Sequence, residues 1–158
     1  MIIKSESDLL RAFRPKDQKS VLPPAQAPYP LEARYYYTWS EPSGVYQYLV
    51  FQNEGWESPL GLVFQRNGLG SHSSPAGMCD WCHSYGASDE IGLLTTVLSS
   101  RKVGGTYLCL DLSCINKLEA QAALTHKSPE QLAQKLLKRI AAFYEKTIWS
   151  QQDSDQSL

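Results

Sequence analysis

The order of apolar and polar positions predicts three strands in the first half of the chain. Aromatic and β-branched residues gather in three runs, and turn-forming residues such as Gly, Pro, Asn and Ser stand between them. The runs are Arg34 to Trp39, Tyr46 to Phe51 and Leu60 to Phe64. Short polar connections between such runs are typical of antiparallel strands. The pattern therefore predicts a three-stranded antiparallel meander at about residues 32–66.

A short amphipathic helix is predicted before these strands. Ser5 or Ser7 can cap its first turn, and its apolar face would carry Leu9 and Phe13. Several prolines follow, and each lacks a backbone donor and disfavours helix at the residue before it. We therefore expect an extended connection over residues 16–30.

A longer helix is predicted near the end of the chain, at about residues 129–149. Ser128 followed by Pro129, with Gln131 three residues after the cap, is a typical helix start. Apolar residues then recur at steps of three and four up to Ile148, which gives the helix one apolar face. We expect this face to pack on the rest of the domain. The polar residues 151–158 predict a disordered tail.

Four cysteines supply the candidate chemistry. Cys79 and Cys82 enclose two residues, and Cys109 and Cys114 enclose four. Four thiolates in a tetrahedron satisfy a zinc ion without water, as in structural sites. Two separated pairs indicate such a site far more strongly than one pair would. We predict that these four residues hold one structural Zn²⁺.

The sequence around the cysteines predicts a treble-clef arrangement at about residues 76–124. The first pair suits a tight turn, and residues 91–97 and 105–109 have the composition of a β-hairpin. A predicted helix from residue 111 to about 124 carries Cys114 in its first turn. The fold class is therefore α+β: an antiparallel meander plus a treble-clef zinc finger, with a long C-terminal helix packed on it. We expect residues 1–150 to form a single zinc-binding domain.

Other functions of the first cysteine pair remain open at this point. Cys79 and Cys82 followed by His83 match a haem-attachment signal, and the pair alone matches a thiol oxidoreductase motif. Neither interpretation accounts for Cys109 and Cys114. Haem attachment also requires export, and the first residues lack the apolar core of a signal peptide.

Composition narrows the class of function. The formal net charge of -1 gives no global attraction to nucleic acid or to an anionic membrane. No run of apolar residues is long enough to span a bilayer, so we expect a cytoplasmic protein without membrane contact. We identify no set of nucleophile, base and acid, and zinc would occupy all four thiols. The sequence therefore predicts no enzyme, no catalytic residues and no small-molecule substrate.

One long motif resembles a known family. It comprises Ala76-Gly-Met-Cys-Asp-Trp-Cys-His83 and Val103-Gly-Gly-Thr-Tyr-Leu-Cys-Leu-Asp-Leu-Ser-Cys114. These segments are similar to the C-terminal treble-clef zinc finger of the elongation-factor-G-binding proteins, which include fusidic-acid-resistance proteins. Phe13, the Trp39 strand and the last helix follow in the family's order, so the resemblance covers roughly residues 8–148.

The resemblance implies a partner and a surface for it. Members dock on elongation factor G and promote its release from the ribosome, through positions that correspond to Met78, Tyr107 and Phe143. Strand alternation could instead turn Tyr107 inward, and Phe143 borders the apolar face of its helix. We expect Trp81 to be exposed, because the two flanking cysteines, Cys79 and Cys82, face the metal and the side chain between them should point outward.

Direct contact with RNA or the ribosome is the alternative function. Basic residues that could contact phosphates lie in the hairpin turn and on the last helix, and Trp81 could stack on a base. They are Arg101, Lys102, Lys135, Lys138 and Arg139. Arg101 or Lys102 could equally replace a lysine of the family's partner-binding surface, whose position corresponds to Gly104 here.

Overall fold

The computed structural model describes residues 1–66 and 77–149 of the chain. It divides into two compact units, Met1–Gln65 and Arg66–Leu158, which we describe separately. That residues 1–150 form a single domain therefore stays a prediction. The Ser, Gly and Asn content of residues 65–77 predicts a loop. Most of these residues, and the whole tail expected at 151–158, lie outside the described residues.

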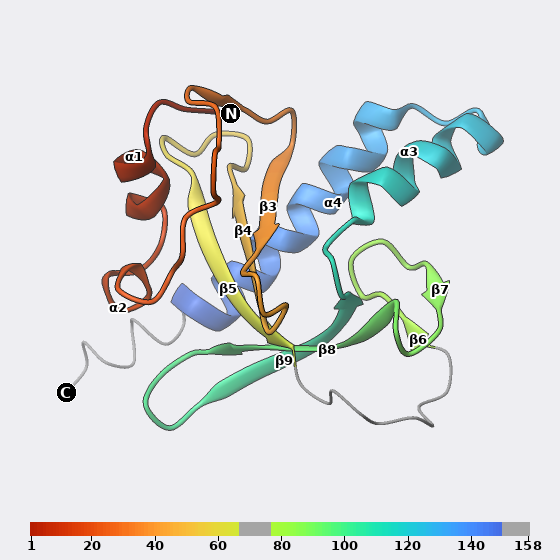
Figure 1. The fold of residues 1–158 in the computed structure, drawn as a ribbon. Coiled ribbons are helices and arrows are strands. Elements are labelled where there is room, and N and C mark those ends of the chain that lie inside the picture. The colour runs from red at the N-terminus through yellow and green to blue at the C-terminus, as the bar shows by residue number, and fades with distance from the viewer. Residues whose placement is uncertain (67–76, 150–158) are drawn as a thin grey trace. The chain divides into compact units, whose positions relative to one another are not determined.

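The first unit contains the predicted meander. Its strands are β3 (Tyr36–Ser40), β4 (Tyr46–Phe51) and β5 (Leu60–Arg66), and β4 pairs antiparallel with both neighbours. Trp39 stands opposite Tyr48, and Leu49 opposite Leu62. Figure 1 shows the three strands side by side. The meander predicted from the alternation of strand and turn residues is confirmed.

An aromatic cluster forms the core of this unit. Helix α1 (Glu6–Arg11) is capped by Ser5, whose hydroxyl accepts a hydrogen bond from the backbone N–H of Asp8. Beyond this helix Phe13 is almost completely buried, and its ring lies edge-on to Trp39 at 5.9 Å and to Tyr48 at 6.3 Å. Gly61 allows this approach, because a Cβ there would lie 2.6 Å from the Phe13 ring.

The connection expected to be extended begins instead with a short helix, α2 (Pro15–Gln18). Pro15 occupies the first helical position, where its fixed φ favours a helix and its missing N–H costs nothing. Arg14 adds a bond from Nε to Asp17 Oδ2 at 2.7 Å. Two further short strands, β1 (Ile2–Ile3) and β2 (Leu31–Glu32), pair with each other and were not predicted.

The second unit begins with two antiparallel ribbons. Strands β6 (Gly77–Met78) and β7 (Tyr85–Gly86) enclose the first cysteine pair. Strands β8 (Ile91–Val97) and β9 (Val103–Cys109) form the longer hairpin, with Leu93 opposite Tyr107. The predicted hairpin is therefore confirmed, with β9 starting two residues earlier than expected.

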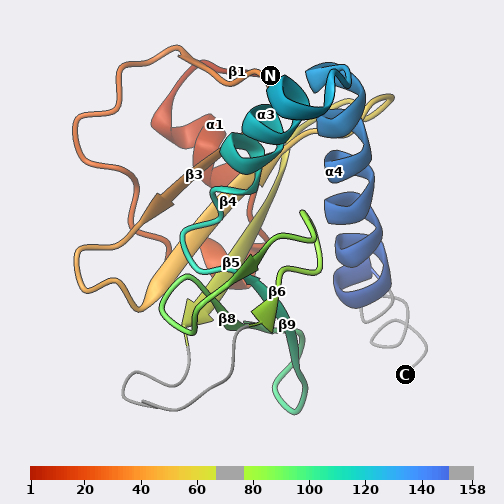
Figure 2. The same ribbon diagram turned by 90° about the vertical axis from the view of Figure 1, so that its right-hand side faces the viewer.

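Two helices complete this unit. Helix α3 (Cys114–Thr125) follows β9 and ends at His126 in the left-handed conformation. Helix α4 (Pro129–Tyr144) starts at the predicted cap, where the Ser128 hydroxyl accepts from the Gln131 N–H, and continues as a π-helical turn, Glu145–Trp149. The two helices lie side by side (Figure 2). None of the helices within residues 1–66 and 77–149 combines the length and apolar character that crossing a membrane requires.

Candidate metal centre

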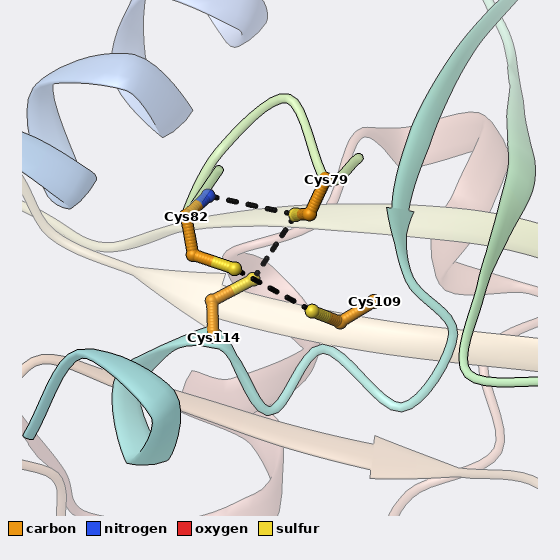
Figure 3. Close-up of side chains that lie close together, drawn as sticks. All are labelled: Cys79, Cys82, Cys109 and Cys114. Carbon is orange, nitrogen blue, oxygen red and sulfur yellow. Dashed lines mark hydrogen bonds between the residues drawn. The ribbon is translucent and has the colours of Figure 1, made fainter. Parts of the chain in front are cut away.

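The structure brings all four cysteines to one point. Cys79, Cys82, Cys109 and Cys114 are each buried, and their sulfur atoms all lie within 4.8 Å of one another. The Sγ atoms of Cys79 and Cys114 are 3.6 Å apart, as are those of Cys82 and Cys109 (Figure 3). The cluster predicted from the two cysteine pairs is confirmed.

These distances fit a tetrahedral zinc site. Zinc binds thiolate at about 2.3 Å, so four sulfurs around one ion stand about 3.8 Å apart. A disulfide would instead require about 2.05 Å between sulfurs, and all four cysteines are free. Four thiolate ligands leave no open coordination position, which is the property of a structural zinc site. One structural zinc ion therefore fits the residues present.

Local backbone geometry aims the first pair of sulfurs. Cys79 and Cys82 lie in the turn between β6 and β7, where the Cys82 N–H points at Cys79 Sγ, 3.5 Å away. The Cys79 N–H donates to the Ser84 carbonyl at 2.9 Å, and the His83 N–H donates to the Cys79 carbonyl at 2.8 Å. His83 closes the turn with a φ of 60°. Its side chain is exposed, as expected for a surface histidine.

The second pair is aimed by the end of a strand and the start of a helix. Cys109 is the last residue of β9, and Cys114 is the first residue of α3. Between them Leu112 adopts a φ of 56° and donates its N–H to the Cys109 carbonyl at 2.9 Å. This turn reverses the chain, so that two cysteines with four residues between them face the same point.

The electrostatics of the cluster favour a divalent cation. Bonds from the thiols of Cys109 and then Cys114 lower the pKa of Cys79 to about 6, and the same two neighbours lower the pKa of Cys82. Interactions with Cys109, Cys79 and Cys82 raise the pKa of Cys114. Four sulfurs this close cannot all ionise without a counter-charge, since like charges in a buried site oppose one another. A zinc ion supplies that charge.

The sequence analysis missed a cationic side chain at this centre. Lys117 Nζ lies 3.2 Å from Cys109 Sγ and donates to it. Desolvation lowers the pKa of Lys117, but the bond to Cys109 and the neighbouring sulfur charges outweigh that effect and raise it. The available signal was spacing: Lys117 follows Cys114 by three residues, which places both on one face of α3.

The structure corrects the prediction for Trp81. We expected an exposed side chain, but Trp81 is only 3% exposed. Its indole packs edge-on against Phe143 of α4, with ring centroids 6.0 Å apart, and Arg139 donates to its backbone carbonyl. Packing against α4 therefore buries this side chain. Arg139, which the sequence analysis names as a possible phosphate contact, therefore binds the cysteine turn instead.

The other predicted contact residues fall into separate groups. Met78 and Tyr107 are 39% and 54% exposed, and both lie beside Gly77, whose missing Cβ would touch the Tyr107 ring. Arg101 and Lys102 are exposed in the turn between β8 and β9. Phe143 is half-buried against Trp81. Tyr107 thus lies beside Gly77, the chain neighbour of Met78, and Phe143 pairs with a buried residue.

A redox pair or a haem-attachment site would use Cys79 and Cys82 alone. Here each of these sulfurs instead contacts a sulfur of the second pair, so the geometry favours one four-ligand metal site.

Comparison with known proteins agrees with this geometry. Residues 7–148 match the family described as the FBP C-terminal treble-clef zinc-finger. A search of curated proteins finds no match. The family match spans both pairs of cysteines, the meander and the helix that covers the cysteine turn, and it confirms the resemblance carried by the sequence motifs. The chain therefore belongs to the FBP C-terminal treble-clef zinc-finger family.

Proposed function

We propose that this protein is a non-enzymatic binding module that docks on elongation factor G and modulates release of the factor from the ribosome. Family membership supports the proposal, because this zinc-finger family is that of elongation-factor-G-binding and fusidic-acid-resistance proteins. On this proposal the protein works in the cytoplasm, where its partner does.

The observation that carries the proposal is an exposed apolar surface on the zinc-finger unit. On one face of the β8–β9 hairpin four apolar side chains are exposed, whereas Leu94, Thr96 and Leu108 on the opposite face are buried. The exposed side holds two cross-strand pairs, Leu93 with Tyr107 and Val97 with Val103. We call these four residues the hairpin strip. An exposed apolar patch of this kind is typical of a protein-binding site.

The cysteine turn extends the hairpin strip at one end. Met78 and Tyr85 face each other across β6 and β7 and are 39% and 77% exposed. The Asp80 N–H donates to the Tyr107 carbonyl at 2.8 Å, and Thr106 Oγ1 donates to Asp80 Oδ2 at 2.5 Å. These bonds hold the turn against β9. Zinc would therefore act by fixing the β6–β7 turn, which carries Met78, against the strand that carries Tyr107, so that the contact surface is rigid before binding.

A structural metal explains why we propose no enzymatic activity. Catalytic zinc sites keep a ligand position for water or substrate, whereas four buried thiolates fill the coordination sphere. The chemistry of this centre is therefore to hold backbone segments together.

RNA binding is the weaker candidate. Arg101, Lys102, Lys135 and Lys138 are exposed and available to phosphates. However, Trp81 is buried and Arg139 is bonded to its carbonyl, so the Trp81 ring is not available to stack on a base.

The test measures binding of the purified protein to elongation factor G, with Met78→Ala combined with Tyr107→Ala. Truncating two anchors of one contact should weaken the affinity by roughly tenfold or more, because hot-spot residues each contribute more than about 1 kcal/mol. Leu124→Ala is the matched control, since Leu124 is 82% exposed on α3 and lies outside this surface. Zinc content should remain that of the parent protein in both variants.

Two outcomes would contradict the proposal. Affinity that survives the double substitution would remove Met78 and Tyr107 from the contact surface. Retention on ribosomes without binding to the isolated factor, with a steep loss between low and moderate salt, would instead favour phosphate contacts and the RNA candidate.

A further inference from the structure

We propose that Lys117 is a positioning residue of the metal centre, which retains zinc and protects the Cys109 sulfur from electrophiles. The inference concerns the zinc site alone and is independent of docking on elongation factor G. It rests on the bond from Lys117 Nζ to Cys109 Sγ at 3.2 Å.

The fold places Lys117 for this contact. Cys114 is the first residue of α3, and Lys117 lies three residues further on, so both side chains project from the same face of the helix. The turn through Leu112 brings Cys109 back to that face. Lys117 is half-buried, so its ammonium group is partly removed from water and directed at the sulfur.

The charge of a four-thiolate site explains what this contact does. Zinc with four thiolates carries a formal charge of about -2, and the sulfurs here are buried. Uncompensated buried charge is costly, so a neighbouring ammonium group stabilises the complete metal site relative to the ion-free thiols. A charge-assisted hydrogen bond is also stronger than a neutral one.

The same bond lowers the reactivity of one particular sulfur. An electrophile attacks a lone pair of a thiolate, and the ammonium group of Lys117 engages a lone pair of Cys109. Cys79 Sγ instead faces a neighbouring thiol and accepts from the Cys82 backbone N–H, at the longer distance of 3.5 Å. We therefore expect Cys109 to react later than Cys79 in the zinc-loaded protein.

The experiment compares Lys117→Met with Lys117→Arg. Both residues have helix propensity similar to that of lysine, so α3 should persist. Only arginine keeps a cationic donor. Lys135→Met is the matched control, because it changes the net charge equally but removes an exposed lysine of α4.

Zinc retention is measured first, by competition with a chromogenic chelator. Loss of an outer-shell partner of a metal ligand typically costs about 10- to 100-fold in affinity, so Lys117→Met should lose at least about tenfold. Lys117→Arg and Lys135→Met should stay close to the parent. Should Lys117→Met fail to fold with metal, rescue by Lys117→Arg still supports the proposal, and failure of arginine to rescue overturns it.

Two further measurements separate positioning from general packing. In the cobalt-substituted protein, loss of the bond to sulfur should move the thiolate-to-cobalt charge-transfer band of Lys117→Met to lower energy. The rate of alkylation by N-ethylmaleimide, followed site by site by mass spectrometry, is the second measurement. In Lys117→Met, Cys109 should react faster relative to Cys79 than it does in the parent protein. Unchanged affinity, an unchanged cobalt spectrum, or equal acceleration at all four cysteines would overturn the proposal.

Discussion

The unit of residues 1–65 buries its aromatic side chains in one cluster, whereas the zinc-finger unit leaves a strip of apolar side chains exposed. Phe13 and Tyr48 are almost completely buried. By contrast Val103 and Tyr107, in β9 of the zinc-finger unit, are 62% and 54% exposed. Both units contain a β-hairpin, so strand pairing alone does not explain why one unit buries its apolar side chains and the other exposes them. The difference lies in the contacts that hold each hairpin in place.

Metal ligation explains this difference. Four buried sulfurs tie the β6–β7 turn, the end of β9 and the start of α3 together. Because binding free energy at such a site is folding free energy, the zinc finger needs less apolar burial than a metal-free unit of its size. One face of its hairpin is therefore available for a partner, as proposed above.

The largest effect is expected from removing a metal ligand. Cys109→Ser should abolish stoichiometric zinc binding and unfold the segment from β6 to α3, since structural zinc in small domains contributes about 10 kcal/mol or more. Amide hydrogen exchange resolved by residue would check the result. Protection in β3 to β5 should persist, because the core around Phe13 contains no metal ligand.

Refolding by excess zinc is the control for this variant, since weak ligation by serine would show as partial recovery. A protein that lacks zinc yet keeps protection throughout β8, β9 and α3 would contradict the structural role. Loss of protection in both units together would mean that the metal also supports the aromatic core, and would break the comparison.

A substitution in the aromatic core should destabilise the unit of residues 1–65. Phe13→Ala removes a buried ring that contacts Trp39 and Tyr48, and such truncations cost about 3–5 kcal/mol. Denaturant unfolding followed by tryptophan fluorescence would measure the loss. Zinc stoichiometry should stay that of the parent protein, and a variant that loses zinc in proportion to stability would contradict this expectation.

Much of the first unit was predictable because its elements depend on local patterns. Runs of aromatic and β-branched residues between turn residues located all three strands of the meander, and Ser5 located the start of α1. Helix α2 was missed because the prolines of this connection were taken as evidence against a helix, although a proline such as Pro15 favours the first helical position.

The metal ligands were predictable because cysteine pairs have few other uses, whereas the surroundings of the site depend on contacts distant in the sequence. Trp81 was expected to be exposed because it lies between two metal ligands in its turn, and its packing against Phe143 of α4 is a contact that the sequence of the turn does not indicate. Arg139 lies 58 residues from the carbonyl that it binds. No periodicity along α4 distinguishes it from the solvated lysines around it.

A smaller effect should follow from Arg139→Ala. The change removes a charged donor from the part-buried Trp81 carbonyl, and a hydrogen bond to a charged group contributes about 1.5–3 kcal/mol. Thermal unfolding of the zinc-loaded protein would measure the loss. Lys138→Ala is the matched control, since Lys138 is the exposed neighbour on the same helix. Equal effects of the two substitutions would show that the bond to the cysteine turn adds no stability.

The smallest effect on stability is expected at the hairpin strip. Val97→Thr combined with Val103→Thr keeps the shape and the β-branching of a cross-strand pair while replacing two exposed methyl groups with hydroxyls. Exposed substitutions of this kind usually change stability by no more than about 0.5 kcal/mol. Leu94→Ala, on the buried face of the same strand, should instead cost about 2–5 kcal/mol.

For binding to elongation factor G we expect the opposite order: the valine pair should have the larger effect on affinity, and Leu94→Ala the smaller. If the hairpin strip is a contact surface, the Val97 and Val103 pair should weaken affinity while leaving the melting temperature unchanged. Leu94→Ala should lower the melting temperature, with affinity preserved in whatever fraction stays folded. If Val97→Thr with Val103→Thr destabilises the fold as much as Leu94→Ala does, these exposed side chains stabilise the zinc finger itself. The contrast between a unit that buries its apolar residues and one that presents them would then be wrong.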